Sequence, residues 1–172
     1  MLQIALELAD TEPVEFCEDI ALPAGVGGDD ALAWEPVHFA GRLRRSGNGY
    51  VVSGKVAGRG TLRCVRCLGE FTFAFEDSFT LHMLPVALAP REDEVQLTKK
   101  DLDVRFFLDP VLDLVELASE QVELLLPVKP LCREDCRGLC PRCGADLNQA
   151  PCACPPEMDE RWRALLDFHP AS

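Results

Sequence analysis

The cysteines constrain the fold of this chain more than any other residue type. Eight of the nine lie in short-spaced groups: Cys64, Cys67, Cys132, Cys136, Cys140, Cys143, Cys152 and Cys154. A two-residue gap lets one tight turn aim two thiolates at one ion, and a structural zinc site takes four ligands, with Zn–S bonds of about 2.3 Å. The sequence therefore predicts two tetrahedral metal sites, with zinc as the cofactor.

The spacing also suggests how the ligands divide. Cys140 and Cys143 lie close enough in sequence to Cys152 and Cys154 for one local, ribbon-like site. We expect the half-sites Cys64/Cys67 and Cys132/Cys136 to complete each other and pin an extended segment onto the tip of a sheet. Cys152 and Cys154 would lie about 6.5 Å apart on a strand. Both can bind one ion only if the backbone turns there, so one of them could be a spectator or serve the other site.

The redox state of the cellular compartment decides whether paired cysteines act as metal ligands or form disulfides. Residues 1–7 have no basic region and no long apolar run, so we expect no leader peptide, no membrane span and a cytoplasmic location. Paired cysteines in a reducing cytoplasm favour metal binding, whereas Cys17 has no partner nearby and is interpreted as a bystander thiol. A redox dithiol at Cys64 and Cys67 is less favoured because this motif joins two predicted strands. Iron–sulfur ligation stays open on spacing alone.

Charge is strongly segregated along a chain of net charge −12. Residues 1–35 hold acidic groups and no Lys or Arg, whereas residues 36–69 hold cations and no Asp or Glu. Any phosphate-binding surface should be built from this basic block, whose members are Arg42, Arg44, Arg45, Lys55, Arg59, Arg63 and Arg66. For Arg63 and Arg66, beside the thiolates, offsetting the negative charge of a metal centre is the favoured alternative. The phosphate role is favoured for Arg42, Arg44 and Arg45.

Periodicity predicts an α+β fold. Alternation at 2–8, 37–43, 50–62 and 71–81 predicts strands, with a hairpin at 46–49 and the Cys64 motif at the next turn. A capping pattern at Asp113 and Glu116 opens a helix that stops at Pro127. We expect an antiparallel β-meander or barrel-like sheet with one packed helix in residues 1–130, including an acidic loop at 85–101. Residues 131–172 should form a small Cys-rich, zinc-ribbon-like module with a short terminal helix capped at Asp159.

The sequence favours a protein without catalytic activity. Gly58-Arg59-Gly60 and Gly25-Val26-Gly27-Gly28 lack the strand-to-helix context of a nucleotide site. The histidines have no ligand-like spacing, and a catalytic zinc would keep an open position. Any metal here should therefore be structural.

The motifs resemble one family. Residues 62–68, 126–128, 131–148, Cys152-x-Cys154 and 159–162 resemble the YceD family, whose members are associated with accumulation of the large-subunit ribosomal RNA. The likeness covers most of the chain from about residue 36 onward. The positions of this chain that match the family's motifs are the eight paired cysteines together with Arg66, Asp135, Gly138, Pro141, Gly144 and Asn148.

The resemblance implies a role in maturation of large-subunit ribosomal RNA or in ribosome assembly. Two partners are consistent with the charges: the large-subunit ribosomal RNA itself, bound through residues 36–69, or a basic large-subunit ribosomal protein gripped by the acidic blocks. The first is favoured, and the second describes an adaptor that does not contact RNA. The sequence makes no prediction of oligomeric state.

Overall fold

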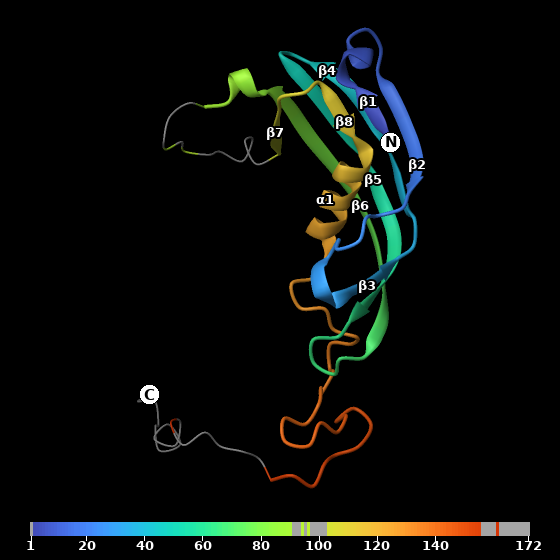
Figure 1. Ribbon diagram of the computed structural model, residues 1–172, viewed down its shortest axis with the longest axis vertical. Coiled ribbons are helices and arrows are strands. Elements are labelled where there is room, and N and C mark those ends of the chain that lie inside the picture. The colour runs from blue at the N-terminus through green and yellow to red at the C-terminus, as the bar shows by residue number, and fades with distance from the viewer. Residues whose placement is uncertain (1, 91–93, 95, 97–102, 156–160, 162–172) are drawn as a thin grey trace, which may run out of the picture.

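The computed structural model describes residues 2–90, 94, 96, 103–155 and 161. A curved sheet occupies one end of the molecule, and loops carrying most of the cysteines lie at the other (Figure 1). The strands are β1 (Gln3–Ala5), β2 (Val14–Ile20), β3 (Ala31–Trp34), β4 (Val37–Ser46), β5 (Gly49–Arg63), β6 (Glu70–Pro85), β7 (Val104–Phe107) and β8 (Val111–Asp113). The helices are α1 (Leu114–Leu125) and three single 3-10 turns, η1 (Leu6–Ala9), η2 (Gly28–Asp30) and η3 (Val86–Leu88).

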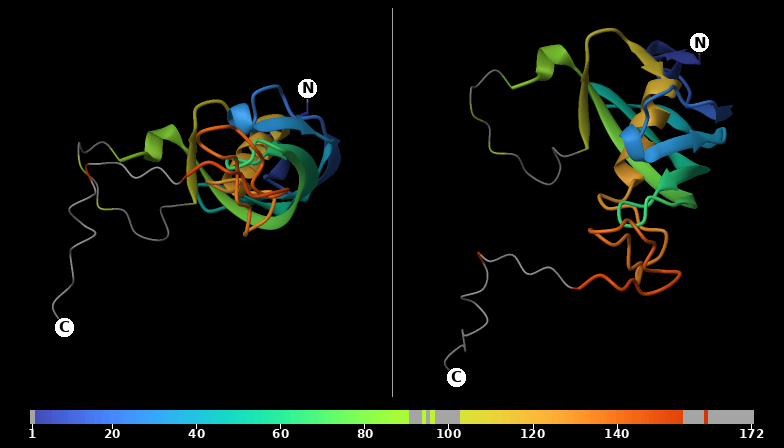
Figure 2. Two further views of the ribbon diagram at one scale, coloured as in Figure 1. Left: turned by 90° about the horizontal axis from the view of Figure 1, so that it is seen from below. Right: turned by 60° about the horizontal axis from the view of Figure 1, so that its bottom comes forward.

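The main sheet has the order β2-β4-β5-β6-β7, with β3 pairing a second stretch of β5. It curls around α1, as the view along the long axis shows (Figure 2). The described strands leave β2 and β7 as open edges, so the barrel-like sheet is not confirmed. Nor is every pairing antiparallel, since β7 runs parallel to β6. β1 and β8 form a separate two-stranded sheet.

The central meander agrees with the sequence. β4 and β5 pair from His38↔Ala57 to Ser46↔Gly49, with Gly47 at a φ of 56° in the turn. β5 and β6 pair from Tyr50↔Met83 to Arg63↔Glu70, so the Cys64 motif lies at their connection. The turn chemistry and the period-two alternation set this register.

The N-terminal third differs from the expectation. The strand predicted over residues 2–8 is only β1, because the chain coils into η1 and buries Leu6 fully while Leu8 is left 61% exposed. β2 was missed because acidic residues obscure the spacing of its buried Phe16 and Ile20. β3 was missed as well, since it is a short strand that follows a stretch rich in glycine.

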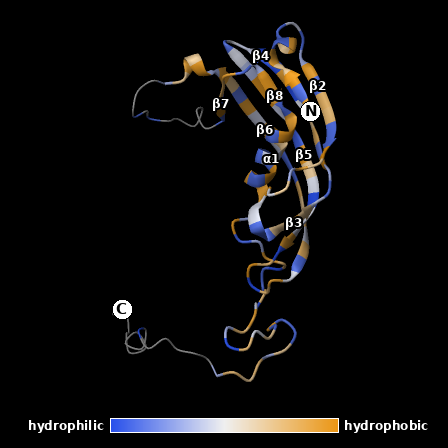
Figure 3. Ribbon diagram, in the orientation of Figure 1, coloured by the Kyte–Doolittle hydropathy of each residue, from blue (hydrophilic) through white to orange (hydrophobic). Residues whose placement is uncertain are grey.

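One core lies between α1 and the inner face of the sheet. Hydrophobic and hydrophilic residues follow one another along the strands (Figure 3), and Phe39, Leu43, Val52 and Val56 of β4 and β5 pack with apolar residues of α1 and the N-terminal segment. The buried residues of the helix are Leu114, Leu117, Ala118 and Val122. The predicted start of the helix is confirmed, because the Asp113 carboxylate accepts from the backbone N–H groups of Val115 and Glu116 at 2.9 and 3.0 Å.

Some expectations fall on other parts of the chain. The predicted terminal helix, with Asp159, Trp162, Leu165 and Leu166, lies outside the described residues, as does most of the acidic loop at 85–101. The division at residue 130 stays a prediction. Within the described residues, none of the helices combines the length and hydropathy needed to cross a bilayer.

Candidate metal centres

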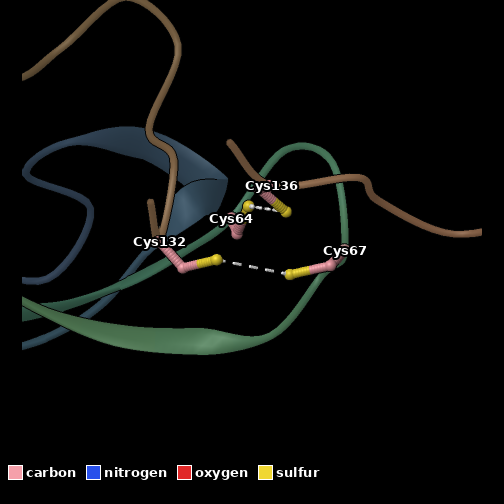
Figure 4. A group of neighbouring side chains, drawn as sticks. All are labelled: Cys64, Cys67, Cys132 and Cys136. Atoms are coloured by element: carbon pink, nitrogen blue, oxygen red, sulfur yellow. Dashed lines mark hydrogen bonds between the residues drawn. The ribbon is translucent and has the colours of Figure 1, made fainter. Parts of the chain in front are cut away.

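The first four-cysteine group joins two distant parts of the chain. Cys64 and Cys67 come from the turn between β5 and β6, and Cys132 and Cys136 from the segment after α1 (Figure 4). The Sγ atoms of Cys64 and Cys136 are 3.8 Å apart, and those of Cys67 and Cys132 are 3.7 Å apart. A tetrahedron with Zn–S bonds of about 2.3 Å has edges of about 3.8 Å. The four thiols are therefore spaced to hold one tetrahedral ion.

The second four-cysteine group is local. Cys140, Cys143, Cys152 and Cys154 also place their sulfurs within 4.8 Å of one another. Residues 151–155 form no strand, so the strand spacing does not apply there, and Cys152 and Cys154 reach the same site. This removes the interpretation of either cysteine as a spectator. Each of the two groups can hold a metal ion.

Both Cys-x2-Cys turns have the same backbone hydrogen bonds. In the first, Leu68 N–H donates to the Cys64 carbonyl and Cys64 N–H to the Gly69 carbonyl, both at 2.9 Å. In the second, Gly144 N–H donates to the Cys140 carbonyl at 2.9 Å and Cys140 N–H to the Ala145 carbonyl at 2.8 Å. The two turns therefore reverse the chain with the same pair of backbone hydrogen bonds, and each reversal directs two thiols to the same side.

The residue after the second cysteine takes the left-handed conformation in both turns. Gly144 has a φ of 71°, as its sequence position suggests, but in the first turn the corresponding residue is Leu68, with a φ of 59°. Gly69 does not supply this conformation, because it lies one position beyond the reversal. Only glycine adopts such a φ without steric cost, so Leu68 is strained.

Hydrogen bonds from the turns also lower the pKa of one thiol in each group. Burial opposes ionisation of Cys64, but N–H groups of Cys67, Cys132 and Arg66 aimed at its sulfur lower its pKa to about 6. The N–H groups of Cys143 and Arg142 lower the pKa of Cys140 to about 6. Each group therefore offers one ready thiolate at neutral pH.

Two of the other thiols do not ionise as easily. Loss of hydration, followed by hydrogen bonds with the other three cysteines that favour its protonated form, raises the pKa of Cys132 to about 12. The pKa of Cys154 is raised to about 12 by its hydrogen bond with Cys143 and then by burial. A divalent cation would remove this obstacle, because it stabilises the thiolate form of every ligand.

Arg66 connects the first turn to the segment that supplies Cys136. Its Nη1 donates to the Cys136 carbonyl at 2.8 Å, and its own carbonyl accepts from Leu139 N–H at 3.1 Å. Gly138 sits against this contact, since a Cβ there would lie 2.9 Å from the Arg66 carbonyl oxygen. Because these bonds join the guanidinium and backbone of Arg66 to the other segment, they favour a structural role for Arg66 over a phosphate role.

Asn148 connects the two four-cysteine groups. Its Nδ2 donates to Cys136 Sγ at 3.5 Å and to Asp146 Oδ1 at 2.8 Å, and its Oδ1 accepts from Arg137 N–H and Arg133 Nη2. The resemblance marked Asn148 as a motif position, but Asp146 was missed. The Asp-x-Asn spacing, typical of a side-chain-stabilised turn, was the available signal.

The basic block divides between the two faces of the sheet. Alternation and register place five of its cations on the outer face: Arg42, Arg44, Lys55, Arg59 and Arg63. Arg45 lies on the other face, where its Nη1 contacts Asp10 Oδ1 at 3.1 Å and its guanidinium covers the Tyr50 ring. On the outer face Arg42 meets Glu15 Oε1 at 2.6 Å, and Lys55 meets Glu76 at 4.0 Å.

Comparison with protein families gives a match over residues 52–169, to the family described as "Large ribosomal RNA subunit accumulation protein YceD". The matched region contains most of β5, all of β6 and α1, and the eight paired cysteines. It leaves out β1, β2, β3 and β4, and so begins later than the likeness expected from about residue 36.

Uncharacterized proteins of mycobacteria are similar to this chain. Those of Mycobacterium bovis and Mycobacterium tuberculosis are each 32% identical over 131 residues, which is 74% of this chain and 59% of theirs. One from Mycobacterium leprae is 29% identical over 133 residues, 77% of this chain and 59% of its own. The chain thus spans about three fifths of the length of these relatives. No solved structure matches it.

Proposed function

The chain belongs to the YceD family of large ribosomal RNA subunit accumulation proteins, and we propose that it supports this accumulation by binding RNA phosphates on the outer face of its sheet, in the cytoplasm and without catalysis. The two four-cysteine groups hold zinc and fix the structure below that sheet. Large-subunit ribosomal RNA is the proposed partner.

One observation carries the RNA proposal: five cations share a single sheet face. Arg42 and Arg44 alternate outward on β4, and the register Arg42↔Ser53 puts Lys55, Arg59 and Arg63 of β5 on the same side. Directly opposite on β6, Lys55 and Arg59 meet the small residues Ser78 and Ala74, whereas Arg63 meets Glu70. A phosphate backbone could therefore approach the cations closely, since phosphate contacts dominate the affinity of such surfaces.

The same face favours recognition of the backbone over recognition of bases. The phenylalanines of β6 lie opposite Leu62, Gly60, Gly58 and Gly54 and so point into the molecule: Phe71, Phe73, Phe75 and Phe79. They cannot provide the stacking platform that sheet-based readers of single-stranded RNA use. The pair between Arg42 and Glu15 has side chains 55% and 70% exposed, and such pairs contribute about 0–1 kcal/mol, so RNA can displace it.

Zinc is the ion best suited to the two groups. Four thiolates leave no open coordination position, which is typical of structural zinc and not of catalytic zinc. Elemental analysis of protein purified without added metal tests this proposal. Two zinc ions per chain are expected, whereas visible absorbance from iron would contradict it.

A second candidate function rests on the acidic groups that meet the basic block. Glu15 and Glu76 neutralise Arg42 and Lys55, and Asp10 engages Arg45. A protein that used its acidic surface to hold a basic ribosomal protein would show such neutralised cations. It would bind that partner and ignore free RNA.

Variants of two adjacent arginines can distinguish the RNA-binding function from the adaptor function. Arg44 and Arg45 are neighbours on β4 with opposite orientations, so Arg44→Ala with Arg59→Ala removes outer-face cations and Arg45→Ala is the matched control. Binding of large-subunit precursor RNA is measured against salt concentration. The double variant should lower the affinity and flatten the log–log salt slope by up to about one unit per lost phosphate contact.

The control variant should leave that slope unchanged, because Arg45 is held by Asp10 and Tyr50. Equal RNA binding by wild type and by the double variant would contradict the proposal. Loss of a ribosomal-protein interaction with unchanged RNA binding would establish the adaptor.

A further inference from the structure

Cys17, which the sequence leaves without a partner, lies in line with a histidine and a carboxylate. Its Sγ is 3.9 Å from His38 Nε2, and His38 Nδ1 is 3.0 Å from Asp19 Oδ1. The thiol and both partners are exposed at the β2 edge of the sheet. None of the three belongs to the four-cysteine groups or to the outer-face cations.

Strand register builds this arrangement. Cys17 and Asp19 are two residues apart on β2 and face the same side, and His38 of β4 is directly opposite Asp19. Cys17 is opposite Ala40, whose small side chain leaves room for the imidazole to lean towards the sulfur. The three groups are therefore positioned by backbone pairing.

The hydrogen bond to Asp19 fixes the role of each imidazole nitrogen. A carboxylate can only accept, so Nδ1 carries a proton, and in the neutral imidazole Nε2 then has its lone pair on the side of the Cys17 thiol. A nitrogen placed there can take the thiol proton, and Asp19 then stabilises the imidazolium. The thiolate is the nucleophilic form of cysteine, and a base beside an exposed thiol is the arrangement that a reactive cysteine needs.

We propose that Cys17 is a modification site, at which a His38-assisted thiol forms a mixed disulfide with a small disulfide. The thiolate attacks one sulfur of the disulfide, forming a new S–S bond as the original one breaks. The departing thiolate takes the proton from His38. The thiol of Cys17 and one disulfide thus give one mixed disulfide and one free thiol, with no other oxidant.

The charged side chains around Cys17 should determine whether a cationic or an anionic disulfide reacts faster with it. The same face near Cys17 holds Glu15 and Asp19 on β2 and Arg42 on β4, with Lys55 one strand further. Arg42 pairs with Glu15 and Lys55 with Glu76, and Asp19 faces the same side as the sulfur, two residues along β2. A cationic disulfide should therefore react faster than an anionic one.

The test uses zinc-loaded full chain, in which the other eight thiols are metal ligands, and cystamine as the cationic disulfide. Intact mass and peptide mapping follow modification with time. Wild type should gain one half-cystamine on Cys17, and His38→Gln should slow this by about tenfold, which is less than the roughly 10²–10⁴-fold effect of an optimally positioned base because Nε2 is 3.9 Å from the sulfur. His82→Gln is the matched control, an exposed histidine of β6 opposite Val51 and away from the thiol.

Cystamine should react several-fold faster than 3,3′-dithiodipropionate, and added salt should reduce the difference. Asp19→Asn, which keeps a hydrogen-bond acceptor for Nδ1 but removes the charge, should slow the reaction less than His38→Gln. Zinc content verifies that each variant is folded. Equal rates for wild type and His38→Gln, or first modification at a cysteine other than Cys17, would overturn the proposal.

Discussion

Asn148 donates from Nδ2 to the sulfur of Cys136 at 3.5 Å, although Asn148 belongs to the loop between Cys143 and Cys152. A side chain from the loop of the second four-cysteine group thereby contacts a ligand of the first. A hydrogen bond to a thiolate stabilises its charge and orients the sulfur, as outer hydrogen bonds do for metal ligands generally. The two groups are physically connected through this residue.

Asn148→Ala should weaken metal retention in the first group. Loss of one hydrogen bond to a charged ligand, at about 1–2 kcal/mol, corresponds to roughly tenfold faster release to a chelator. Gln149→Ala is the control, because Gln149 Nε2 donates to Asp146 Oδ2 at 3.1 Å and not to a cysteine. Release followed with a colorimetric chelator should be unchanged in the control. Equal release from both variants would mean that Asn148 does not support the ligand.

Leu68 and Gly144 both have a left-handed backbone, so changing Leu68 to glycine and Gly144 to alanine should have opposite effects on the free energy of unfolding. Leu68→Gly should raise the free energy of unfolding by up to about 1 kcal/mol, because the relief of left-handed strain exceeds the added chain entropy of glycine. Leu68 is 58% exposed, so little burial is lost. Urea denaturation at fixed zinc concentration measures the change.

Gly144→Ala should lower the free energy of unfolding by about 1 kcal/mol. No atom lies within 4 Å of a Cβ built at Gly144, so the cost comes from the φ of 71° and not from a clash. The pair of variants gives an internal control. A stabilising effect of Gly144→Ala would show that the second turn is not formed as described.

Metal binding should release a pH-dependent number of protons. The pKa of Cys64 and that of Cys140 are each lowered to about 6, so at about pH 7.5 both are already thiolates, and each ion releases fewer than four protons. At about pH 5, below both pKa values, each group should release about one proton more. Calorimetry in buffers of different ionisation enthalpy counts these protons. The same number at both pH values would contradict the low pKa values.

The sequence predicts local features of this chain well. The turn residues Gly47 and Asn48 and the alternation on either side identify the β4–β5 hairpin, and Asp113 identifies the start of α1. The cysteine spacing predicts both four-cysteine groups, since a close pair of cysteines can place two ligands at one ion. Each of these signals is carried by residues close together in the chain.

Other features depend on contacts that spacing does not encode. The parallel pairing of β7 with β6 joins segments separated by a long connection. The strain of Leu68 comes from a backbone turn that Gly69 obscures in the sequence. His38 reaches Cys17 only because β2 and β4 are paired in one particular register. Tertiary structure decides all three.

The most direct test of the proposed function is ultraviolet cross-linking of the protein in assembling large-subunit particles, with identification of the cross-linked peptides. We expect large-subunit ribosomal RNA attached to peptides from β4 and β5 that carry Arg44, Arg59 or Arg63. The cross-links should fall when Arg44 and Arg59 are changed to Ala, and stay when Arg45 is changed. Cross-links to ribosomal protein alone, or RNA attached only outside these strands, would contradict the proposal.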